Sequence, residues 1–293
     1  MIHKMGSTFV YKNVGNCAIK GDFYSTEASN APLLVYIHGG GLIWGSRDEL
    51  SEEQINLYNN AGFNICSIDY RLAPESKLPD IISDIQDALR WLKDEGVNTF
   101  NFDPDKIGVI GSSGGGYLAL LTGIFEVKPK AIVSFYGYGN ITGDWYTKPS
   151  PYFTKMAKVP EALPKMLIQP SILSEAPIEK RYGIYLYCRQ QGVWNDYVIG
   201  RNQTKAELTK YCPIDNIHSD YPATLLLHGD KDDDVPHEES VNMSRALEDA
   251  GITNKLITIP NGKHQFDKEM NDPNVKDAFH QVIQFLKENL DVN

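Results

Sequence analysis

A segment of glycines and serines near the middle of the chain has the spacing of an activated serine nucleophile. Residues 111–115 read Gly-Ser-Ser-Gly-Gly and fit the pattern G-x-S-x-G, with Ser113 at its centre. The glycines leave room for a sharp turn in which Cβ atoms would collide. A flexible loop could show the same five letters, but a β-branched apolar run precedes them and a helix-forming apolar run follows. We therefore predict a strand, a tight turn and a helix, with Ser113 at the turn beside the positive end of the helix.

A serine hydroxyl becomes a good nucleophile when a nearby base takes its proton and a carboxylate orients that base. The predicted base is His264, which lies in a turn with Gly262 after the last predicted strand. It completes the chain order serine, aspartate, histidine that is expected for a nucleophile at such a turn. His228 precedes the acidic loop and is expected to pack as a structural residue. Other histidines lie near a terminus, inside a helix or away from a glycine turn: His3, His218, His237 and His280.

The carboxylate is expected in residues 230–236, where four aspartates fall within five positions directly after a predicted strand. An acidic, solvated loop explains two or three of them. Asp232 is the predicted partner of the histidine, because its place between Gly229 and the Val-Pro pair suits a short turn directed back towards the sheet. Asp230 and Asp233 remain the alternatives.

A glycine run earlier in the chain could stabilise the negative charge that develops during acyl transfer. Residues 38–41 read His-Gly-Gly-Gly after an apolar strand, and successive glycines let backbone N–H groups face a reacting oxygen without obstruction. Gly40 and Gly41, together with the amide of Gly114, are the predicted oxyanion donors. A phosphate-binding loop is the alternative, but no P-loop pattern of lysine and Ser/Thr follows. His38 is expected to orient the loop rather than to carry protons.

Alternating strands and helices are predicted to bring these loops together. The expected strands cover residues 8–14, 17–25, 33–37, 64–70, 106–111, 130–136, 223–229 and 255–260, and the main helices cover 49–61, 80–95, 237–250 and 273–289. The first two strands form an antiparallel hairpin. The alternation indicates an α/β fold with a mostly parallel sheet covered by helices on both faces. Functional loops of such a sheet follow the carboxyl ends of its strands, which is where the candidate residues fall.

Between residues 140 and 212 this alternation breaks down. The segment is rich in proline and tyrosine, has only short helix-like pieces at 161–168 and 178–191, and lacks a clear strand. We predict a cap or lid inserted into an α/β core formed by residues 1–139 and 213–293. Aromatic residues of the cap suggest a partly aromatic site, although packing of the segment explains most of them: Trp145, Tyr146, Tyr152, Phe153, Tyr182, Tyr185, Tyr187 and Trp194.

Composition and charge place the chain among ordinary globular proteins. It has 293 residues, of which 42% are hydrophobic and 23% charged, and a net charge of −10. The acidity argues against nucleic acid or an anionic membrane as the main partner. The first residues lack the apolar core of a signal peptide and no run is long enough to cross a bilayer, so the cytoplasm is the expected location. Four separated cysteines form no C-x-x-C pair and indicate neither a zinc site nor a disulfide framework.

Taken together, these motifs resemble the α/β-hydrolase superfamily and, more narrowly, its hormone-sensitive-lipase-like esterases and lipases. The motifs that carry the resemblance are His38-Gly39-Gly40-Gly41, residues 69–75, the G-x-S-x-G segment, His228-Gly229 with Asp232 and Val235-Pro236, and His264. The resemblance covers about residues 30–140 and 220–290. It implies a triad of Ser113, His264 and Asp232, oxyanion donors at the three glycines, and no cofactor.

Two features depart from that family. Many members carry an acidic residue before the nucleophile, where this chain has Ser112, and many have a long helical cap at the N-terminus. Here only about thirty residues precede the strand that leads into the glycine loop, so the cap function is expected to fall to residues 140–212. These residues would form the walls of the substrate pockets. Residues 70–75 are expected mainly to brace the loop after their strand.

The resemblance implies a serine hydrolase that cleaves carboxylic esters of short or medium acyl chain through an acyl-enzyme. Its expected partner is a small ester substrate, and a homodimer remains open. An amide or peptide hydrolase related to prolyl oligopeptidases or formamidases is the first alternative, because those enzymes share the triad. A non-catalytic small-molecule receptor on the same fold is the second, although such receptors typically lose a triad residue and this chain keeps all three.

Overall fold

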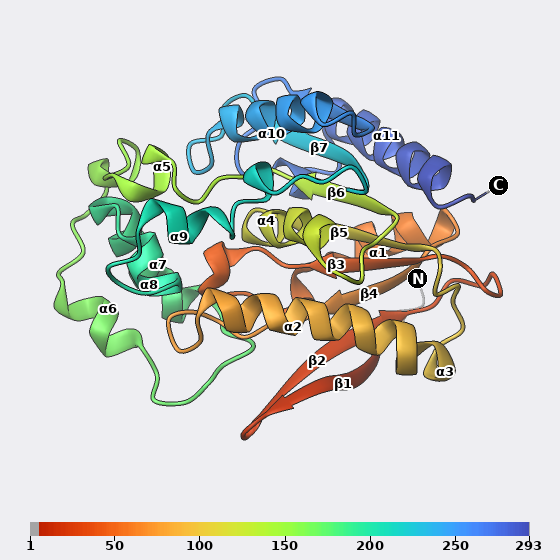
Figure 1. The fold of residues 1–293 in the computed structure, drawn as a ribbon, viewed down its shortest axis with the longest axis horizontal. Coiled ribbons are helices and arrows are strands. Elements are labelled where there is room, and N and C mark those ends of the chain that lie inside the picture. The colour runs from red at the N-terminus through yellow and green to blue at the C-terminus, as the bar shows by residue number, and fades with distance from the viewer. Residues whose placement is uncertain (1–5, 293) are drawn as a thin grey trace.

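The protein is built on an eight-stranded sheet in the computed structural model, which describes residues 6–292 (Figure 1). The strands are β1 (Ser7–Val14), β2 (Cys17–Tyr24), β3 (Leu33–Ile37), β4 (Asn64–Ile68), β5 (Ile107–Ser112), β6 (Ala131–Phe135), β7 (Ala223–Gly229) and β8 (Asn254–Ile259). They lie in the order β1-β2-β4-β3-β5-β6-β7-β8. β2 pairs antiparallel with both β1 and β4, and the remaining pairs are parallel. The prediction of an α/β fold with a mostly parallel sheet is confirmed.

Helices cover both faces of the sheet, which explains why the central strands are unbroken apolar runs. One face packs against α2 (Leu78–Trp91), α4 (Gly114–Leu121) and α10 (His237–Asp249), and the other against α1 (Glu52–Asn60) and α11 (Pro273–Asn289). All residues of β3, β5 and β6 are buried. Successive side chains of β3 enter opposite cores: Val35 lies on the α4 side, whereas Leu34 and Tyr36 lie on the α11 side.

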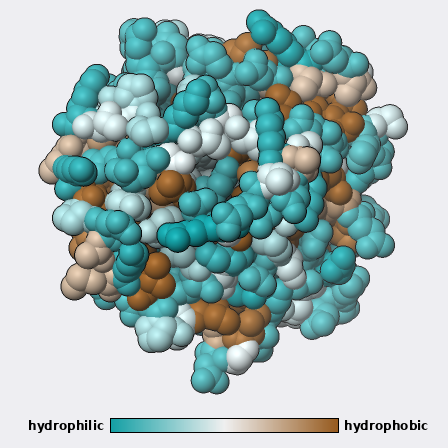
Figure 2. Space-filling model, turned by 60° about the vertical axis from the view of Figure 1, so that its left-hand side comes forward, coloured by the Kyte–Doolittle hydropathy of each residue, from teal (hydrophilic) through white to brown (hydrophobic). Residues whose placement is uncertain are grey.

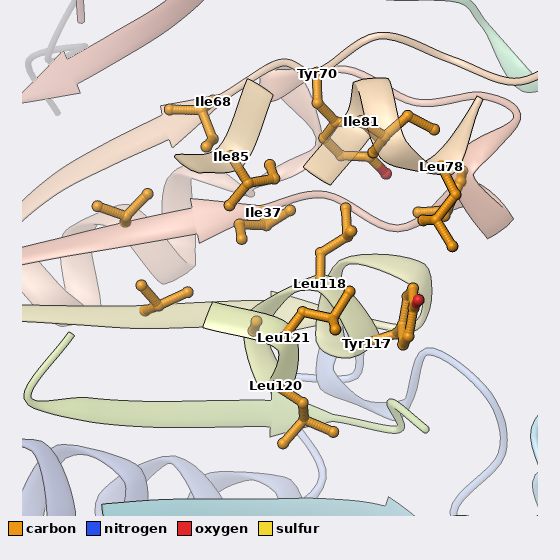
Figure 3. Packing of buried hydrophobic residues seen from close by; sticks show 14 of the residues in the cluster. Ile37, Ile68, Tyr70, Leu78, Ile81, Ile85, Tyr117, Leu118, Leu120 and Leu121 are labelled. Atoms are coloured by element: carbon orange, nitrogen blue, oxygen red, sulfur yellow. The ribbon is translucent and has the colours of Figure 1, made fainter. Parts of the chain in front are cut away.

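Helix α4 lies at the centre of the hydrophobic core on the face of the sheet that α2 and α10 also cover (Figure 3). All eight of its residues are buried. Leu118 and Leu121 lie near Ile37 of β3 and Ile85 of α2. Close packing of this kind leaves little freedom to shift. It therefore fixes the first residue of α4 relative to the end of β5.

Two predicted helices differ from the observed ones near their ends. Helix α1 begins at Glu52, later than predicted, because the side-chain oxygen of Ser51 caps it there. Helix α2 begins slightly before the predicted range of 80–95. It continues through a wider π-turn (Leu92–Gly96) into the short α3 (Val97–Thr99). Both differences lie away from the candidate site.

Residues 140–212, all of which the structure describes, contain short helices and no strand, as the sequence predicts. The helices are α5 (Asp144–Thr147), α6 (Ala162–Leu167), α7 (Ile178–Gln191), α8 (Trp194–Val198) and α9 (Lys205–Thr209). They gather at one end of the sheet, on the left of Figure 1.

A buried ion pair ties this segment to the loops that follow β3 and β4. Arg181 of α7 contacts Glu75 at 2.6 Å, and the two side chains are only 2% and 3% exposed. Arg181 also donates to the carbonyl oxygens of Ile43 at 3.0 Å and Ala73 at 2.7 Å. Residues 70–75, which were expected to brace their own loop, therefore also anchor residues 140–212 through α7.

The surface on the side of α5–α9 is mainly hydrophilic (Figure 2). Hydrophobic residues appear there in separate patches rather than as one continuous face. Met166 of α6 is among the few large apolar side chains that are exposed. Within residues 6–292, no helix combines the length and the apolar character needed to span a bilayer.

Candidate active site

The turn between β5 and α4 holds Ser113 in a strained backbone conformation. Its φ of 54° and ψ of −119° lie outside the regions that residues with a side chain ordinarily adopt. Neighbouring glycines make this turn possible. A Cβ atom on Gly111 would lie 2.1 Å from the carbonyl oxygen of Gly115, and one on Gly115 would lie 2.1 Å from that of Ile37. The sequence thus folds locally as predicted, with Ser113 at the turn.

The structure brings the three predicted side chains together. Nε2 of His264 lies 3.0 Å from Oγ of Ser113, and Nδ1 of His264 lies 2.7 Å from Oδ2 of Asp232. Both distances are those of hydrogen bonds. The two alternatives for the carboxylate lie elsewhere. Asp230 accepts from the backbone N–H of Asn261 at 2.7 Å, and Asp233 is exposed.

Asp232 is held as a buried carboxylate. Its Oδ1 accepts from the backbone N–H groups of Asp234 at 2.8 Å and Val235 at 3.0 Å, and its side chain is fully buried. Burial alone would raise the pKa of Asp232, but hydrogen bonding to His228 and His264 outweighs it and lowers the pKa below its usual range. His228 is fully buried, as expected of a structural residue, yet its Nε2 also lies 3.3 Å from Oδ2 of Asp232. A charged Asp232 can therefore orient the imidazole.

The environment of His264 favours its protonated form. Burial alone would lower the pKa of His264, but the hydrogen bond to Asp232 and the charges of Asp234, Asp232 and Asp267 raise it above its usual value. The side chain is 17% exposed, so Nε2 remains accessible from the cavity. A base of this kind can take a proton from Ser113 and hold it as an imidazolium.

The glycine loop lies against the turn that carries Ser113. A Cβ atom on Gly114 would lie 3.2 Å from the backbone nitrogen of Gly41, so the two backbones are in close contact. Gly40 and Gly41 have φ of 82° and 58°, in the region that favours glycine. Gly114 is the first residue of α4, and the first N–H groups of a helix have no partner within it. The three predicted oxyanion donors are therefore neighbours.

His38 packs beneath this loop. Its ring is fully buried and stacks on Tyr70, with the ring centroids 4.2 Å apart. Burial lowers the pKa of His38 to about 3, so the ring is neutral near pH 7. The hydroxyl of Tyr70 donates to the carbonyl oxygens of His38 at 3.0 Å and Gly39 at 2.9 Å. This geometry fits the scaffold role that the sequence suggested.

Comparisons with known proteins agree with this architecture. A family model named BD-FAE matches residues 22–162, and the model of the prolyl oligopeptidase family matches residues 182–293. The structure of an α/β-hydrolase superfamily protein from Enterococcus faecalis is similar, with a TM-score of 0.75 at 24% identity over 97% of this chain and 99% of that one. The chain therefore has the fold of that α/β-hydrolase superfamily protein.

Two further similarities involve proteins with more specific names. An acetyl ester-xyloside bifunctional hydrolase from Caldicellulosiruptor lactoaceticus has a TM-score of 0.73 at 19% identity, over 99% of this chain and 98% of that one. A non-reducing polyketide synthase of Penicillium brasilianum is 28% identical in an alignment that covers 88% of this chain and 12% of the synthase. The chain thus spans only 12% and 13% of the length of the first two curated relatives that it matches.

A cavity of about 1130 Å³ opens beside Ser113 and His264. Four aromatic side chains of residues 140–212 form part of its wall: Tyr152, Phe153, Tyr182 and Tyr185. The other predicted aromatic residues pack within the segment, where Tyr146 stacks on Trp145 and Trp194, and Tyr187 packs against Tyr197. The segment therefore supplies an aromatic wall, and packing accounts for the rest.

Two charged residues of the site were missed by the sequence analysis. Oδ2 of Asp234 lies 4.0 Å from Nε2 of His264, and Oδ1 of Asp234 is paired with Arg189 of α7. Tyr185, one turn before Arg189, contacts the same carboxylate. The spacing of these two residues places them on one face of a helix. This spacing alone does not indicate that the face contacts the acidic loop of residues 230–236.

A second group that was missed packs against the ring of His264. The ring centroid of Tyr136 lies 4.6 Å from that of the imidazole, and the Tyr136 hydroxyl donates to Asp267 at 2.5 Å. Asp267 is 4% exposed and also accepts from the side chain of Gln54 at 3.1 Å. This arrangement holds a further acidic side chain, besides Asp232 and Asp234, in place close to the candidate base.

Proposed function

We propose that this α/β hydrolase cleaves carboxylic esters through a covalent acyl-enzyme. One observation carries the proposal: Asp232, His264 and Ser113 form a continuous hydrogen-bonded chain beside the glycine loop. That chain provides a nucleophile, a base and an orienting carboxylate, and the adjacent amides are donors for an oxyanion. The esterase-like motifs and the similarity to the acetyl ester-xyloside hydrolase support the same chemistry.

In the acylation step, Oγ of Ser113 attacks the carbonyl carbon of the ester while Nε2 of His264 takes the hydroxyl proton. The carbonyl oxygen becomes an oxyanion, which the amides of Gly40, Gly41 and Gly114 would receive. The C–O bond to the alcohol then breaks. His264 gives its proton to the departing alcohol oxygen, and the acyl group stays on Ser113.

In the deacylation step, a water molecule takes the place of the alcohol. His264 removes a proton from the water as it attacks the acyl carbon, and the same amides stabilise the second oxyanion. Collapse of this intermediate breaks the bond to Ser113, and His264 returns the proton to the serine. The products are a carboxylic acid and the free enzyme. Asp232 keeps its charge throughout and stabilises the imidazolium.

We expect acyl chains of short or medium length. The cavity wall mixes aromatic rings with charged side chains such as Glu49, Glu179 and Lys268, which suits a small polar ester better than a long fatty-acyl chain. Residues 140–212 would act as the cap over this cavity. A homodimer and a cytoplasmic location stay predictions from the sequence.

Covalent labelling and turnover test the proposal together. A fluorophosphonate should label the wild-type protein at Ser113, and the protein should turn over p-nitrophenyl acetate. Ser113→Ala should abolish labelling and lower turnover by at least ~1000-fold, because the nucleophile is gone. The matched control is Ser112→Ala, which removes a hydroxyl from the neighbouring residue and should keep both signals. Labelling at another serine would contradict the assignment.

Amide or peptide hydrolysis is the second candidate, because the prolyl oligopeptidase model matches residues 182–293. Ester and anilide substrates with the same acyl group separate the two reactions. We expect kcat/KM for the ester to exceed that for the anilide by far more than their difference in intrinsic reactivity. Comparable values would favour an amidase. Labelling without turnover of either substrate would instead favour a receptor that keeps an ordered triad.

A further inference from the structure

The loop that carries Asp232 places a second carboxylate on the opposite side of the imidazole. Asp232 contacts Nδ1 of His264, whereas Oδ2 of Asp234 lies 4.0 Å from Nε2. Nε2 is also the atom that contacts Ser113, and Asp234 lines the cavity at this point. The side chain of Asp232 is fully buried, whereas that of Asp234 is 20% exposed. One carboxylate therefore faces the protein interior and the other faces the space that a substrate must occupy.

Helix α7 determines which oxygen of Asp234 faces the cavity. Oδ1 accepts from the hydroxyl of Tyr185 at 2.6 Å and from the guanidinium of Arg189. Arg189 also donates to the backbone carbonyl oxygen of Asp234 at 2.8 Å. The Arg189 side chain is 2% exposed and lies over the rings of Trp145 and Phe153, which hold it in place. Oδ1 is therefore occupied, and Oδ2 is the acceptor that remains on the cavity side.

The acylation step decides which part of a substrate meets this oxygen. His264 must deliver its Nε2 proton to the leaving oxygen, so that oxygen has to come within hydrogen-bond distance of Nε2. The carbonyl oxygen is directed towards the glycine loop instead. Oδ2 of Asp234, which is itself close to Nε2, therefore lies beside the leaving alcohol rather than beside the acyl chain.

We propose that Asp234 is a specificity-determining residue that accepts a hydrogen bond from a hydroxyl group on the leaving alcohol, adjacent to the ester. The inference rests on the proposed ester hydrolysis and assigns it a substrate class, the monoesters of diols and polyols. A neutral hydroxyl suits the site because Arg189 already balances the charge of Asp234, while Oδ2 keeps its lone pairs. A hydroxyl on the neighbouring carbon is also close enough to the leaving oxygen to lie beside Nε2.

Two acetate esters that differ by one methyl group test this contact. Ethylene glycol monoacetate can donate to Oδ2, whereas ethylene glycol monomethyl ether acetate has a closely similar leaving group without a donor. We expect kcat/KM of the wild-type protein to be about tenfold higher for the hydroxy ester. A ratio near one in the wild-type protein overturns the inference by itself, whatever the variants do.

Asp234→Asn reverses the polarity of the atom that faces the cavity and keeps its size. The amide oxygen meets the donors of Tyr185 and Arg189, so the NH₂ group is directed towards the cavity as a donor. We expect the preference for the hydroxy ester to disappear or reverse. The matched control, Asp233→Asn, removes the same charge from the exposed neighbour and should retain the preference. An Asp234→Asn protein with the wild-type ratio overturns the inference.

Fluorophosphonate labelling separates the failure of this inference from the failure of the proposed function. Labelling of each variant at Ser113 shows that its site is assembled. Full labelling and turnover with equal ratios for the two esters overturn only the role of Asp234. Absence of both labelling and ester turnover in the wild-type protein overturns ester hydrolysis, and the inference with it.

Discussion

The two sides of the cavity are built by different means. On the side of the sheet the backbone places the reactive groups, because glycines allow both the turn at Ser113 and its contact with the glycine loop. On the side of residues 140–212, charged side chains hold the wall of the cavity in position. Arg181 and Arg189 of α7 each pair with a carboxylate outside that segment. The sheet side has no room for an added Cβ atom at these glycines, whereas the side of residues 140–212 depends on paired charges. Chemistry and substrate preference should therefore fail under different substitutions.

The distances along the chain differ in the same way. The glycines that shape the serine turn lie next to Ser113 in the sequence, so the turn forms from local interactions. Arg189 and Asp234 are 45 positions apart, and Arg181 and Glu75 are 106 apart. These contacts form only when α7 packs against the loops that carry Asp234 and Glu75. Substrate preference can therefore change without any change in the residues around the nucleophile.

Gly115→Ala tests the sheet side and should have the largest effect. The added Cβ would lie 2.1 Å from the carbonyl oxygen of Ile37 and 2.4 Å from that of His38, so either β3 or α4 must move. We expect the free energy of unfolding to fall by ~3 kcal/mol or more. Turnover of a p-nitrophenyl ester should fall by at least ~100-fold, because the serine and the glycine loop lose their alignment. Urea unfolding and steady-state kinetics measure the two effects.

Gly251→Ala is the matched control for that collision. Its φ of 72° strains an alanine, but none of the described atoms beyond the adjacent backbone lies within 4 Å of the added Cβ. We expect a loss of ~1 kcal/mol in the free energy of unfolding and unchanged turnover. Gly115 itself has no positive φ, so a loss there no larger than the loss at Gly251 would contradict the role of close backbone approach on the sheet side.

Arg181→Met tests the other side and should mainly affect stability. It leaves the carboxylate of Glu75 buried without its cation, and we expect the free energy of unfolding to fall by ~3 kcal/mol. Adding Glu75→Gln should recover part of this loss, because no buried charge then remains. The exposed pair of Lys165 and Glu161 is the control, and Lys165→Met should cost less than ~0.5 kcal/mol. If the second substitution gives no recovery, packing rather than charge holds the segment.

Local signals explain why most of the fold and the three triad candidates could be predicted. Strand β7 and helix α11 have the predicted bounds, because their apolar patterns and flanking residues define them without reference to the rest of the chain. The serine turn is equally local. The spacing from Gly229 and the Val-Pro pair favours Asp232 among the four aspartates and leaves Asp230 and Asp233 as alternatives.

The remaining charged groups could not be predicted, because their contacts join segments that are far apart in the sequence. Asp267 meets Tyr136 across 131 positions. The same holds for an uncharged pair, because Ser112 hydrogen-bonds to Tyr36 across 76 positions at 3.0 Å. No periodicity or spacing in the sequence predicts such long-range pairs. They follow from tertiary packing, which the sequence pattern alone does not specify.

Asp267→Asn should cause the smallest change, a shift in pH dependence. Burial alone would lower the pKa of His264, but its bond to Asp232 and the nearby carboxylates, including Asp267, raise it. His264 acts as a base only when it is neutral, so activity is lost as the pH falls through this raised pKa. Removing one carboxylate lowers the pKa. The acid limb of kcat/KM should therefore move to lower pH by ~0.5 unit.

Glu269→Gln removes the same charge from a nearby exposed position and provides the control. Solvent and salt screen an exposed charge, so its shift should be smaller than ~0.2 unit. Profiles of kcat/KM at constant ionic strength report the pKa of the free enzyme and allow the two variants to be compared directly. Equal shifts in both variants would mean that the charge of Asp267 has no specific effect on the pKa of His264. The role of Asp267 would then be its hydrogen bond with Tyr136. A larger downward shift for Asp267→Asn, with kcat at high pH retained, would mean that the sheet side contributes charge to the base as well as shape.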